Sequence, residues 1–134
     1  MVGCGRVGQQ LVKDFTRDGH TVSVVDRDPS AFARVPDDFP AQLIIGTGMD
    51  EDVLGSAGIE AADSFVAVTE DDNTNIMAAE IAHVIYKVPR VVVRIYDPER
   101  AEIYGGFGLD VICPTLAVAR LIEERVLSAA PQPS

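Results

Sequence analysis

Short runs of β-branched and aliphatic residues alternate along the chain with segments whose apolar residues recur at helical spacing. The β-type runs cover residues 21–26, 42–46, 64–68, 90–95 and 109–113, and glycine, proline or aspartate bounds each of them. Between them, Val7, Leu11, Val12 and Phe15 fall on one face of a helix from about residue 6 to 18. This alternation predicts an α/β fold with a doubly wound parallel β-sheet, arranged as three layers, α/β/α.

Capping residues mark where the later helices begin. We expect five more helices, begun by Asp28-Pro29, Asp50, Asp72, Asp97-Pro98 and Thr115. The fourth of the six should run from about residue 72 to 87, and the last carries an apolar stripe that includes Leu121 and Ile122. Only Met1 and Val2 precede Gly3, so the first strand is expected to be short. We assign residues 1–128 to one domain and the proline-containing segment 129–134 to a tail or linker.

Composition and charge narrow the possible partners. Hydrophobic residues form 47% of the chain and aromatic residues 6%, which is typical of a buried parallel sheet rich in aliphatic side chains. No apolar run approaches the roughly 20 residues of a membrane span, so we expect a cytoplasmic protein without direct membrane insertion. The formal net charge of -10 disfavours nucleic acid as a partner. Cys4 and Cys113 lie far apart in sequence, so the spacing predicts neither a disulfide framework nor a metal site.

The opening residues form a glycine pattern that is typical of phosphate binding. Residues 3–8 read G-x-G-x-x-G between a short β-type segment and an amphipathic helix. Gly3 would make the tight turn, Gly5 would let the backbone approach a phosphate, and Gly8 would let helix and strand pack closely. The free amides and the dipole at the helix start would hold the phosphates, and Arg6 is a cation well placed to meet them. We therefore expect a Rossmann-like fold that binds an adenine nucleotide.

An acidic residue stands where such a site needs one for the ribose. Asp26 is the last residue of the β-type run at 21–26, which follows the short first strand. It comes 18 residues after Gly8 (26 minus 8), close to the expected spacing of about 20. Its carboxylate would accept hydrogen bonds from ribose hydroxyls and so favour an unphosphorylated ribose such as that of NAD. Arg27 offers the alternative of binding a 2′-phosphate.

Further candidates lie at the carboxyl ends of later strands, where ligands bind in open parallel sheets. Thr47 and Gly48 follow the third expected strand, Thr69 follows the fourth, and Arg94 closes the fifth. Arg94 could bind phosphate in bidentate fashion, or could instead form a salt bridge with Asp97.

Several motifs resemble the nucleotide-binding domain of the RCK (regulator of potassium conductance) family, the amino-terminal half of TrkA-type potassium-uptake regulators. They are GCGRVG at 3–8, VVDRD at 24–28, GTGMD at 46–50, VAVTEDD at 66–72 with Asn75, and DVICP at 110–114. The arginine after the second glycine, Arg6, and the run at 66–75 are the most specific. The family commonly has an acid where this chain has Thr47.

The resemblance implies a cytoplasmic sensing subunit that binds NAD(H) or ATP/ADP. Such domains form homodimers or larger rings beneath a membrane-embedded potassium transporter or channel. In this sequence the residues facing the nucleotide would be Gly3, Gly5, Arg6, Val7, Asp26, Arg27, Thr47, Gly48, Thr69 and Arg94. The resemblance also implies a smaller ligand-binding lobe after such a domain, which these 134 residues do not include.

The alternative is the cofactor-binding domain of an NAD-dependent oxidoreductase, since one fold hosts both functions. Hydride-transfer enzymes usually need a substrate domain and an acid/base group facing the nicotinamide. His20 is expected in a turn away from the strand tips, and His83 on or near the apolar face of the fourth helix. We therefore predict a regulatory protein rather than an enzyme. A structural subunit with a vestigial site is a third possibility.

Overall fold

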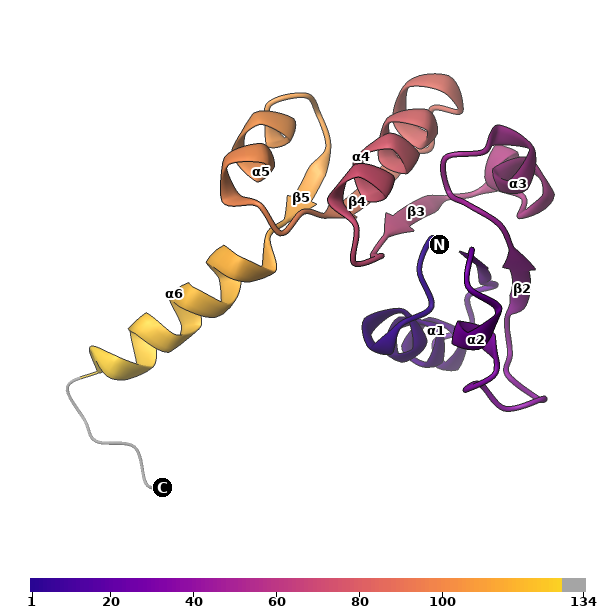
Figure 1. The fold of residues 1–134 in the computed structure, drawn as a ribbon, viewed down its shortest axis with the longest axis horizontal. Helices are drawn as coiled ribbons and strands as arrows, with labels where there is room; N and C mark the ends of the chain where they lie inside the picture. The colour runs from indigo at the N-terminus through magenta and orange to yellow at the C-terminus, as the bar shows by residue number, and fades with distance from the viewer. Residues whose placement is uncertain (129–134) are drawn as a thin grey trace.

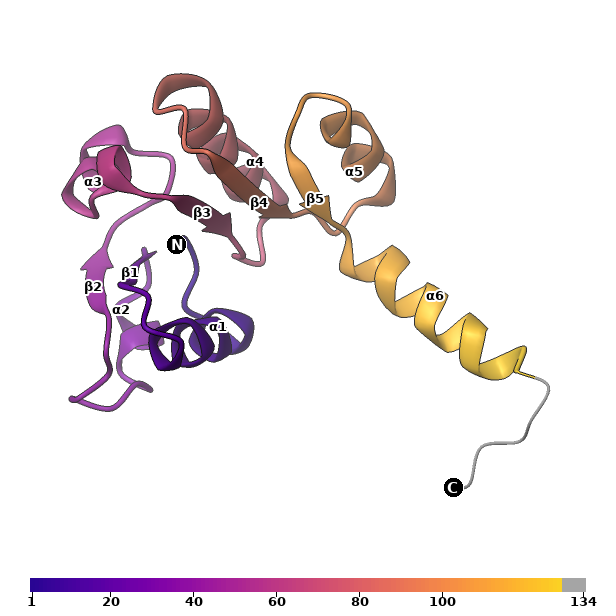
Figure 2. The same ribbon diagram turned by 180° about the vertical axis from the view of Figure 1, so that it is seen from behind.

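Parallel strands and helices alternate throughout residues 1–128, the part of the chain that this computed structural model describes (Figures 1 and 2). The strands are β1 (Ser23–Asp26), β2 (Gln42–Ile45), β3 (Ser64–Ala67), β4 (Arg90–Arg94) and β5 (Asp110–Ile112). The helices are α1 (Arg6–Arg17), α2 (Pro29–Phe32), α3 (Glu51–Ser56), α4 (Asp72–Glu80), α5 (Pro98–Gly105) and α6 (Pro114–Val126), with two short helices, η1 (Ile59–Ala61) and η2 (Ile81–Ile85). The expected tail at 129–134 lies outside the described residues.

The segment at residues 1–3 joins two groups of strands into one parallel arrangement. β1 pairs with β2, and β3 pairs with β4, which pairs with β5. Val2 bridges the two groups, because it pairs with both Val25 and Ala67. The resulting order is β2-β1-(1–3)-β3-β4-β5, in which the chain winds outward in both directions from its first residues. This topology confirms the expected doubly wound α/β fold.

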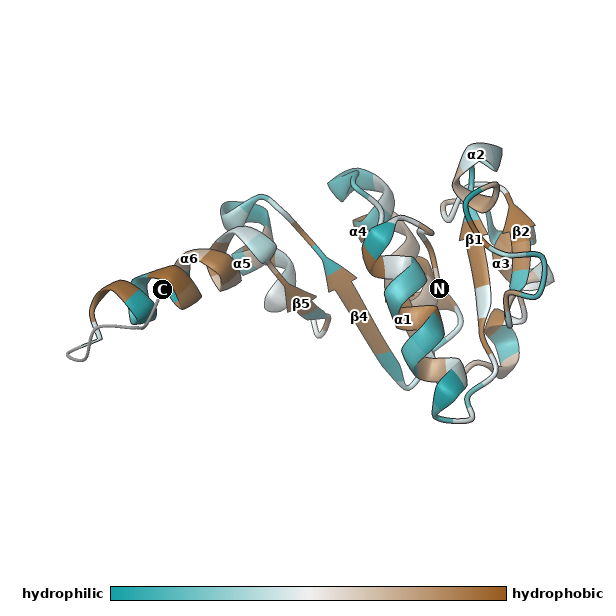
Figure 3. Cartoon of the chain, turned by 90° about the horizontal axis from the view of Figure 1, so that it is seen from below, coloured by the Kyte–Doolittle hydropathy of each residue, from teal (hydrophilic) through white to brown (hydrophobic). Residues whose placement is uncertain are grey.

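Two apolar clusters cover the two faces of this sheet. Leu54 of α3, Ile76 of α4 and Ala101 of α5 pack with the larger cluster, which also contains Val2. Val12 of α1 packs on the other face with Cys4, Val24 and partly buried residues of α2. In Figure 3 the apolar colour follows β1, β2 and β4 between these helices. Among the described residues, no helix combines the length and apolar character that a membrane crossing requires.

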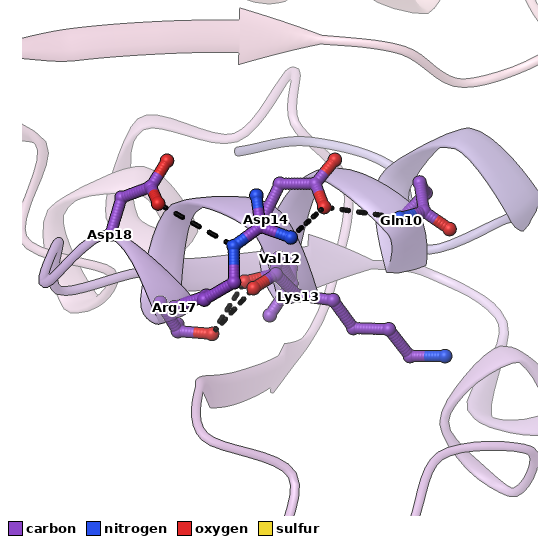
Figure 4. Close-up of polar contacts among 7 residues, drawn as sticks. Gln10, Val12, Lys13, Asp14, Arg17 and Asp18 are labelled. Atoms are coloured by element: carbon purple, nitrogen blue, oxygen red, sulfur yellow. Dashed lines mark hydrogen bonds and ion pairs between the residues drawn. The ribbon is translucent and has the colours of Figure 1, made fainter.

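On the exposed side of α1, polar side chains contact one another (Figure 4). Gln10 donates to Asp14 at 3.1 Å, and Arg17 lies 3.5 Å from both Asp14 and Asp18. Such exposed pairs contribute little to stability, on the order of 0–1 kcal/mol. The helix ends at Arg17, and Gly19 two residues later has a φ of +90°, the left-handed conformation that commonly follows the end of a helix.

Two helices differ from expectation. The fourth is α-helical only to Glu80 and continues as a π-helix, in which Tyr86 N–H donates to Ile81 O five residues earlier. The sixth begins at Pro114, and the expected cap, Thr115, donates its hydroxyl to Tyr96 O at 2.9 Å instead. α6 also extends away from the sheet, as Figures 1 and 2 show, and none of its residues is buried.

Candidate functional site

All ten residues predicted for the nucleotide site line one cavity of about 870 Å³, which we call the glycine-turn cavity. It opens at the carboxyl ends of β1 and β3 on either side of residues 1–3. This is the point where the strand order reverses, and open α/β sheets bind ligands at such a point. The remaining lining residues include Cys4, Asp28, Ser30, Arg34, Glu70, Asp71, Thr74 and Tyr96.

The glycines of the turn have different physical roles. Gly3 has φ +108°, and a Cβ there would lie 2.9 Å from Thr69 N, so both conformation and close approach require glycine. A Cβ on Gly8 would collide with the carbonyl of Gly3, which ties α1 to the strand. A Cβ on Gly5 would meet nothing within 4 Å, so glycine at this position leaves space open.

The start of α1 presents unpaired backbone donors. Gly5 is the N-cap, and no side chain caps the helix. The first bond within the helix runs from Gln9 N–H to Gly5 O at 2.9 Å, so the amides of residues 5–8 have no acceptor inside the helix. With no acid in the first turn, the positive end of the helix dipole is not neutralised locally. These donors suit an anionic group such as a phosphate.

Asp26 lies at the end of β1 and joins the glycine turn to the start of α2. One carboxylate oxygen accepts Cys4 N–H at 2.9 Å, and the other accepts Asp28 N–H at 2.9 Å. Each oxygen keeps a lone pair that could accept a further hydrogen bond. Burial, followed by the charge of Asp26, raises the pKa of the Cys4 thiol, so Cys4 remains a neutral thiol beside the turn.

Arginines gather in the glycine-turn cavity although the chain is acidic. Four of the 11 lysines and arginines line it: Arg6, Arg27, Arg34 and Arg94. Among residues 1–128 the ion pairs involve only Arg17, so none of the four is neutralised in this way. The expected alternative of an Arg94–Asp97 salt bridge is therefore wrong.

Two of the acids that line the same cavity cap helices. Asp28 caps α2 and Asp71 caps α4, and hydrogen bonds from Ser30 and Thr74, respectively, lower the pKa values of the two carboxyls. The charge of Arg27, which lines the same cavity, lowers both pKa values a little further.

Arg94 is held by the end of β3. Its guanidinium donates to Val68 O at 2.6 Å and to Thr69 O at 3.0 Å, and it lies 5.0 Å from the centre of the Tyr96 ring. Its Nε is buried and has no hydrogen-bond partner among the described residues. This unpaired donor fits a site that receives an acceptor from a ligand.

Asn75 is a residue whose role the sequence did not reveal. It is fully buried, and its amide donates to Thr69 O and Arg94 O at 2.9 Å each. Its oxygen accepts the N–H of Thr69 at 2.9 Å and the hydroxyl at 2.6 Å. Asn75 thus fixes the ends of β3 and β4 on α4, and the Thr69 hydroxyl is used inside the protein.

Gly48 and Thr47 lie on the far side of the glycine-turn cavity, after β2. A Cβ on Gly48 would lie 2.6 Å from Val2 Cγ1, so core packing requires this glycine. From the sequence, Gly48 was expected only to face the nucleotide. Thr47 accepts Met49 N–H at 3.2 Å in a local turn.

Arg34 and Tyr96 are lining residues that sequence reasoning missed. Tyr96 could have been found, because it follows Arg94 by two positions and so faces the same side of the strand end. Arg34 lies beyond the end of α2, where no regular spacing indicates its direction. Of the two histidines, His20 packs against Phe15 at the opposite edge of the sheet, and neither lines the glycine-turn cavity.

Comparison with known proteins gives one consistent family. The model of the TrkA-N domain matches residues 1–114. The Trk system potassium uptake protein TrkA of Streptomyces coelicolor is 44% identical over 127 residues, which are 95% of this chain and 55% of that protein. TrkA of Mycobacterium tuberculosis is 32% identical over 130 residues, covering 94% of this chain and 58% of that protein. The chain thus spans little more than half the length of these curated relatives.

Solved structures share the fold at lower identity. The TrkA-N domain of the inner membrane protein YbaL from Escherichia coli superposes with a TM-score of 0.80 at 18% identity, covering 95% of this chain and 93% of that one. The Shewanella denitrificans Kef CTD in an AMP-bound form gives a TM-score of 0.78 at 24% identity, covering 97% and 80%. GsuK bound to ADP gives 0.79 at 24% identity, covering 94% and 32%.

Proposed function

Because the chain belongs to the TrkA-N domain family, we propose that its glycine-turn cavity binds an adenine nucleotide, NAD(H) or ATP/ADP, and that it acts as the nucleotide-sensing regulatory domain of a potassium uptake system. One observation carries the proposal. The open space at Gly5, the free amides at the start of α1 and four arginines meet in one cavity of about 870 Å³.

The parts of the nucleotide are assigned by the chemistry of the lining. The phosphates bind at Gly3, Gly5, Arg6 and Val7, where the helix amides point into the cavity. The adenosine ribose binds Asp26, and Arg27 lies beside it. Thr47 and Gly48 contact the adenine side, and Thr69 and Arg94 contact the second half of the ligand. The bound AMP and ADP that the names of two structural neighbours state support an adenine nucleotide as the ligand class.

A regulatory role rather than catalysis is supported by what lines the cavity. Neither histidine of the chain is among the lining residues, and three of the four lining acids, Asp26, Asp28 and Asp71, accept hydrogen bonds from the protein, whereas the fourth is Glu70. A general acid or base needs hydrogen-bond reach of the reacting atom. The relatives carry the name of potassium uptake proteins, which supports a membrane transporter or channel as the partner of a cytoplasmic domain.

We expect the domain to assemble at least as a homodimer. α6 carries Leu116, Val118, Leu121, Ile122 and Val126, each more than half exposed. On the sheet face opposite α4 and α5, Ile112 of β5 is also 51% exposed. A second copy could cover both surfaces through one two-fold contact.

The proposal is tested with purified protein and a panel of NAD, NADH, NADP, ADP and ATP. The melting temperature should rise with an adenine nucleotide, because a ligand that binds only the native state adds RT ln(1 + [L]/Kd) to the free energy of unfolding. Chromatography of the same mixtures should recover the nucleotides unchanged. Oxidation of NADH or hydrolysis of ATP at catalytic rates would replace the regulatory proposal with an enzymatic one.

A further inference from the structure

Tyr96 lines the glycine-turn cavity with its side chain and contacts two helices with its backbone. The centre of its ring lies 5.0 Å from the guanidinium of Arg94, which lines the same cavity. Residues two positions apart along an extended chain face the same side, so Arg94 and Tyr96 form one wall of the cavity. A ligand that contacts this wall therefore acts on both side chains.

The N–H side of Tyr96 is held by α4. The Tyr96 N–H donates to one carboxylate oxygen of Asp72 at 2.8 Å, and the Asp97 N–H donates to the other at 3.1 Å. Asp72 lies in the first turn of α4, the helix whose Asn75 also binds the ends of β3 and β4. The backbone at Tyr96 is thus attached to the helix that organises this side of the cavity.

The carbonyl of Tyr96 faces the start of α6. It accepts the Thr115 hydroxyl at 2.9 Å and lies 3.5 Å from Cys113 Sγ. Among residues 1–128, the bond from Thr115 is the one hydrogen bond that a residue of α6 makes with another element. None of the residues of α6 is buried, so packing within the chain does little to fix the direction of this helix. We call the bond between Thr115 and Tyr96 O the α6 anchor.

Arg94 provides a means by which a ligand can act on the α6 anchor. Its Nε is buried without a hydrogen-bond partner among the described residues, while its other N–H groups donate to Val68 O and Thr69 O. An acceptor of the ligand at Nε would complete the hydrogen bonds of the guanidinium and hold it against the Tyr96 ring. Such a ligand binds better when Tyr96 is in place, and a difference in affinity between two arrangements is what shifts a conformational equilibrium.

We propose that Tyr96 couples the glycine-turn cavity to α6, so that a nucleotide engaging Arg94 strengthens the α6 anchor and fixes the direction of this helix. The proposal rests on nucleotide binding in that cavity, and it adds the route by which occupancy reaches a helix outside the cavity. Without the anchor, α6 is connected to the sheet only through the chain at Cys113.

The strength of the coupling is limited by the anchor itself. One hydrogen bond changes an equilibrium by up to about tenfold, and the α6 anchor is exposed to solvent. Coupling between two sites is reciprocal, so loss of the anchor should weaken nucleotide binding by the same factor by which the nucleotide strengthens the anchor. The coupling should therefore be measurable without being required for binding.

The test measures amide hydrogen exchange of residues 117–122 in the 134-residue chain, with ADP and NADH in parallel, each at saturation. Calorimetric titration of the same samples records binding. A bound nucleotide should slow exchange in this segment of the wild type, because an anchored first turn frays less. Thr115→Val removes the hydroxyl and keeps the branched shape. It should bind nucleotide within about tenfold of the wild-type affinity and lose the slowing.

Thr115→Ser is the matched control, because it keeps the hydroxyl and should keep the slowing. A change in oligomeric state would alter exchange in both variants alike, so the difference between them isolates the α6 anchor. Tyr96→Leu interrupts the route at the cavity, since it removes the ring beside Arg94 and leaves the backbone bonds of residue 96. It should lose the slowing by nucleotide and keep the wild-type exchange rate of α6 without nucleotide.

The outcomes separate this proposal from the proposed function. Equal slowing in the wild type and in Thr115→Val would overturn the coupling through Tyr96, and so would a wild type that binds nucleotide without any slowing. A wild type that binds neither ADP nor NADH in the calorimeter would overturn the proposed function itself, and the coupling with it.

Discussion

In the proposed nucleotide site, Asp26 is the residue on which the choice between nucleotides should depend. Its two oxygens accept the N–H groups of Cys4 and Asp28, so the carboxylate is already oriented before any ligand binds. An oriented carboxylate favours two ribose hydroxyls and repels a 2′-phosphate, whereas Arg27 favours the phosphate. In the proposed site, the balance between these two neighbours should set the preference between NAD and NADP.

The Asp26→Asn variant should bind NAD about tenfold or more weakly, because a charge-assisted hydrogen bond is worth about 1–3 kcal/mol. The substitution should also reduce the difference in affinity between NAD and NADP. Asp38→Asn, at an exposed position outside the glycine-turn cavity, is the matched control. Calorimetric titration of both variants checks this, and wild-type preference for NADP would contradict the role given to Asp26.

The buried Met1 amine makes the stability of the chain depend on pH. Burial lowers its pKa from 8.0 to about 6, so between these values the unfolded chain binds a proton that the folded chain does not. Stability should therefore rise as the pH increases from 6 to 8, by about 2–3 kcal/mol from this group. Urea unfolding across this range measures it. Acetylation of the Met1 amine should remove this contribution, and an equal slope in the acetylated chain would rule it out.

Single residues also show where sequence reasoning reached its limit. The places of Gly3, Gly5 and Asp26 at the glycine-turn cavity were predictable, because they follow from local turn geometry and from spacing along two consecutive strands. Gly48 was assigned to ligand approach, but its contact with Val2 depends on tertiary packing that no local pattern encodes. The alternative salt bridge of Arg94 with Asp97 was wrong, because the carbonyls of Val68 and Thr69 hold the guanidinium.

At the scale of elements, the sequence predicted the alternation of strands and helices correctly. It did not predict how the fourth helix ends or how the sixth begins. The aspartate caps of α2, α3 and α5 accept backbone N–H groups as expected, because capping is a local interaction. The π-helix after Glu80 and the contact of Thr115 with Tyr96 depend on neighbouring elements. The sequence therefore located the helices and strands, but it did not predict the contacts that α4 and α6 make with neighbouring elements.

Substitution of Asn75 tests whether its hydrogen bonds hold the strand ends that line the glycine-turn cavity. Asn75→Ala leaves Thr69 N–H and two carbonyls without their buried partner, so it should lower the free energy of unfolding by about 2–4 kcal/mol. Asn73→Ala, on the exposed side of the same helix, should cost less than about 1 kcal/mol. Chemical denaturation compares the two. Equal losses would show that the Asn75 bonds do not join these strands.

At the scale of the whole molecule, the extended α6 and the exposed face of β5 favour assembly. Light scattering at tens of micromolar should give at least a dimer. The double substitution Leu121→Asp and Ile122→Asp should shift the protein toward the monomer, because it places charges on a buried apolar contact. Glu124→Ala on the same helix should leave the mass unchanged. A wild-type monomer with and without nucleotide would contradict the proposed dimer.

Sequence patterns could establish this topology because each crossover is short and right-handed crossovers are strongly preferred. They could also establish which strand ends surround the glycine-turn cavity, since parallel strands end at one edge. They could not show that α6 leaves the sheet, because an apolar stripe fits an intramolecular core and a contact between copies equally well. The same ambiguity applied to the fourth helix, where Ile76 and Ile81 are buried while Met77 and Val84 are exposed.

The central claim is that the glycine turn holds the phosphates of an adenine nucleotide. Calorimetric titration of Gly5→Val tests it most directly, because a side chain at Gly5 meets no protein atom within 4 Å and φ of −77° suits any residue. Gly55→Val is the matched control, since Gly55 also has open space around it and lies outside the glycine-turn cavity. Gly5→Val should fold like the wild type and lose nucleotide binding, while Gly55→Val keeps it. Unchanged nucleotide affinity in a folded Gly5→Val protein would contradict the claim.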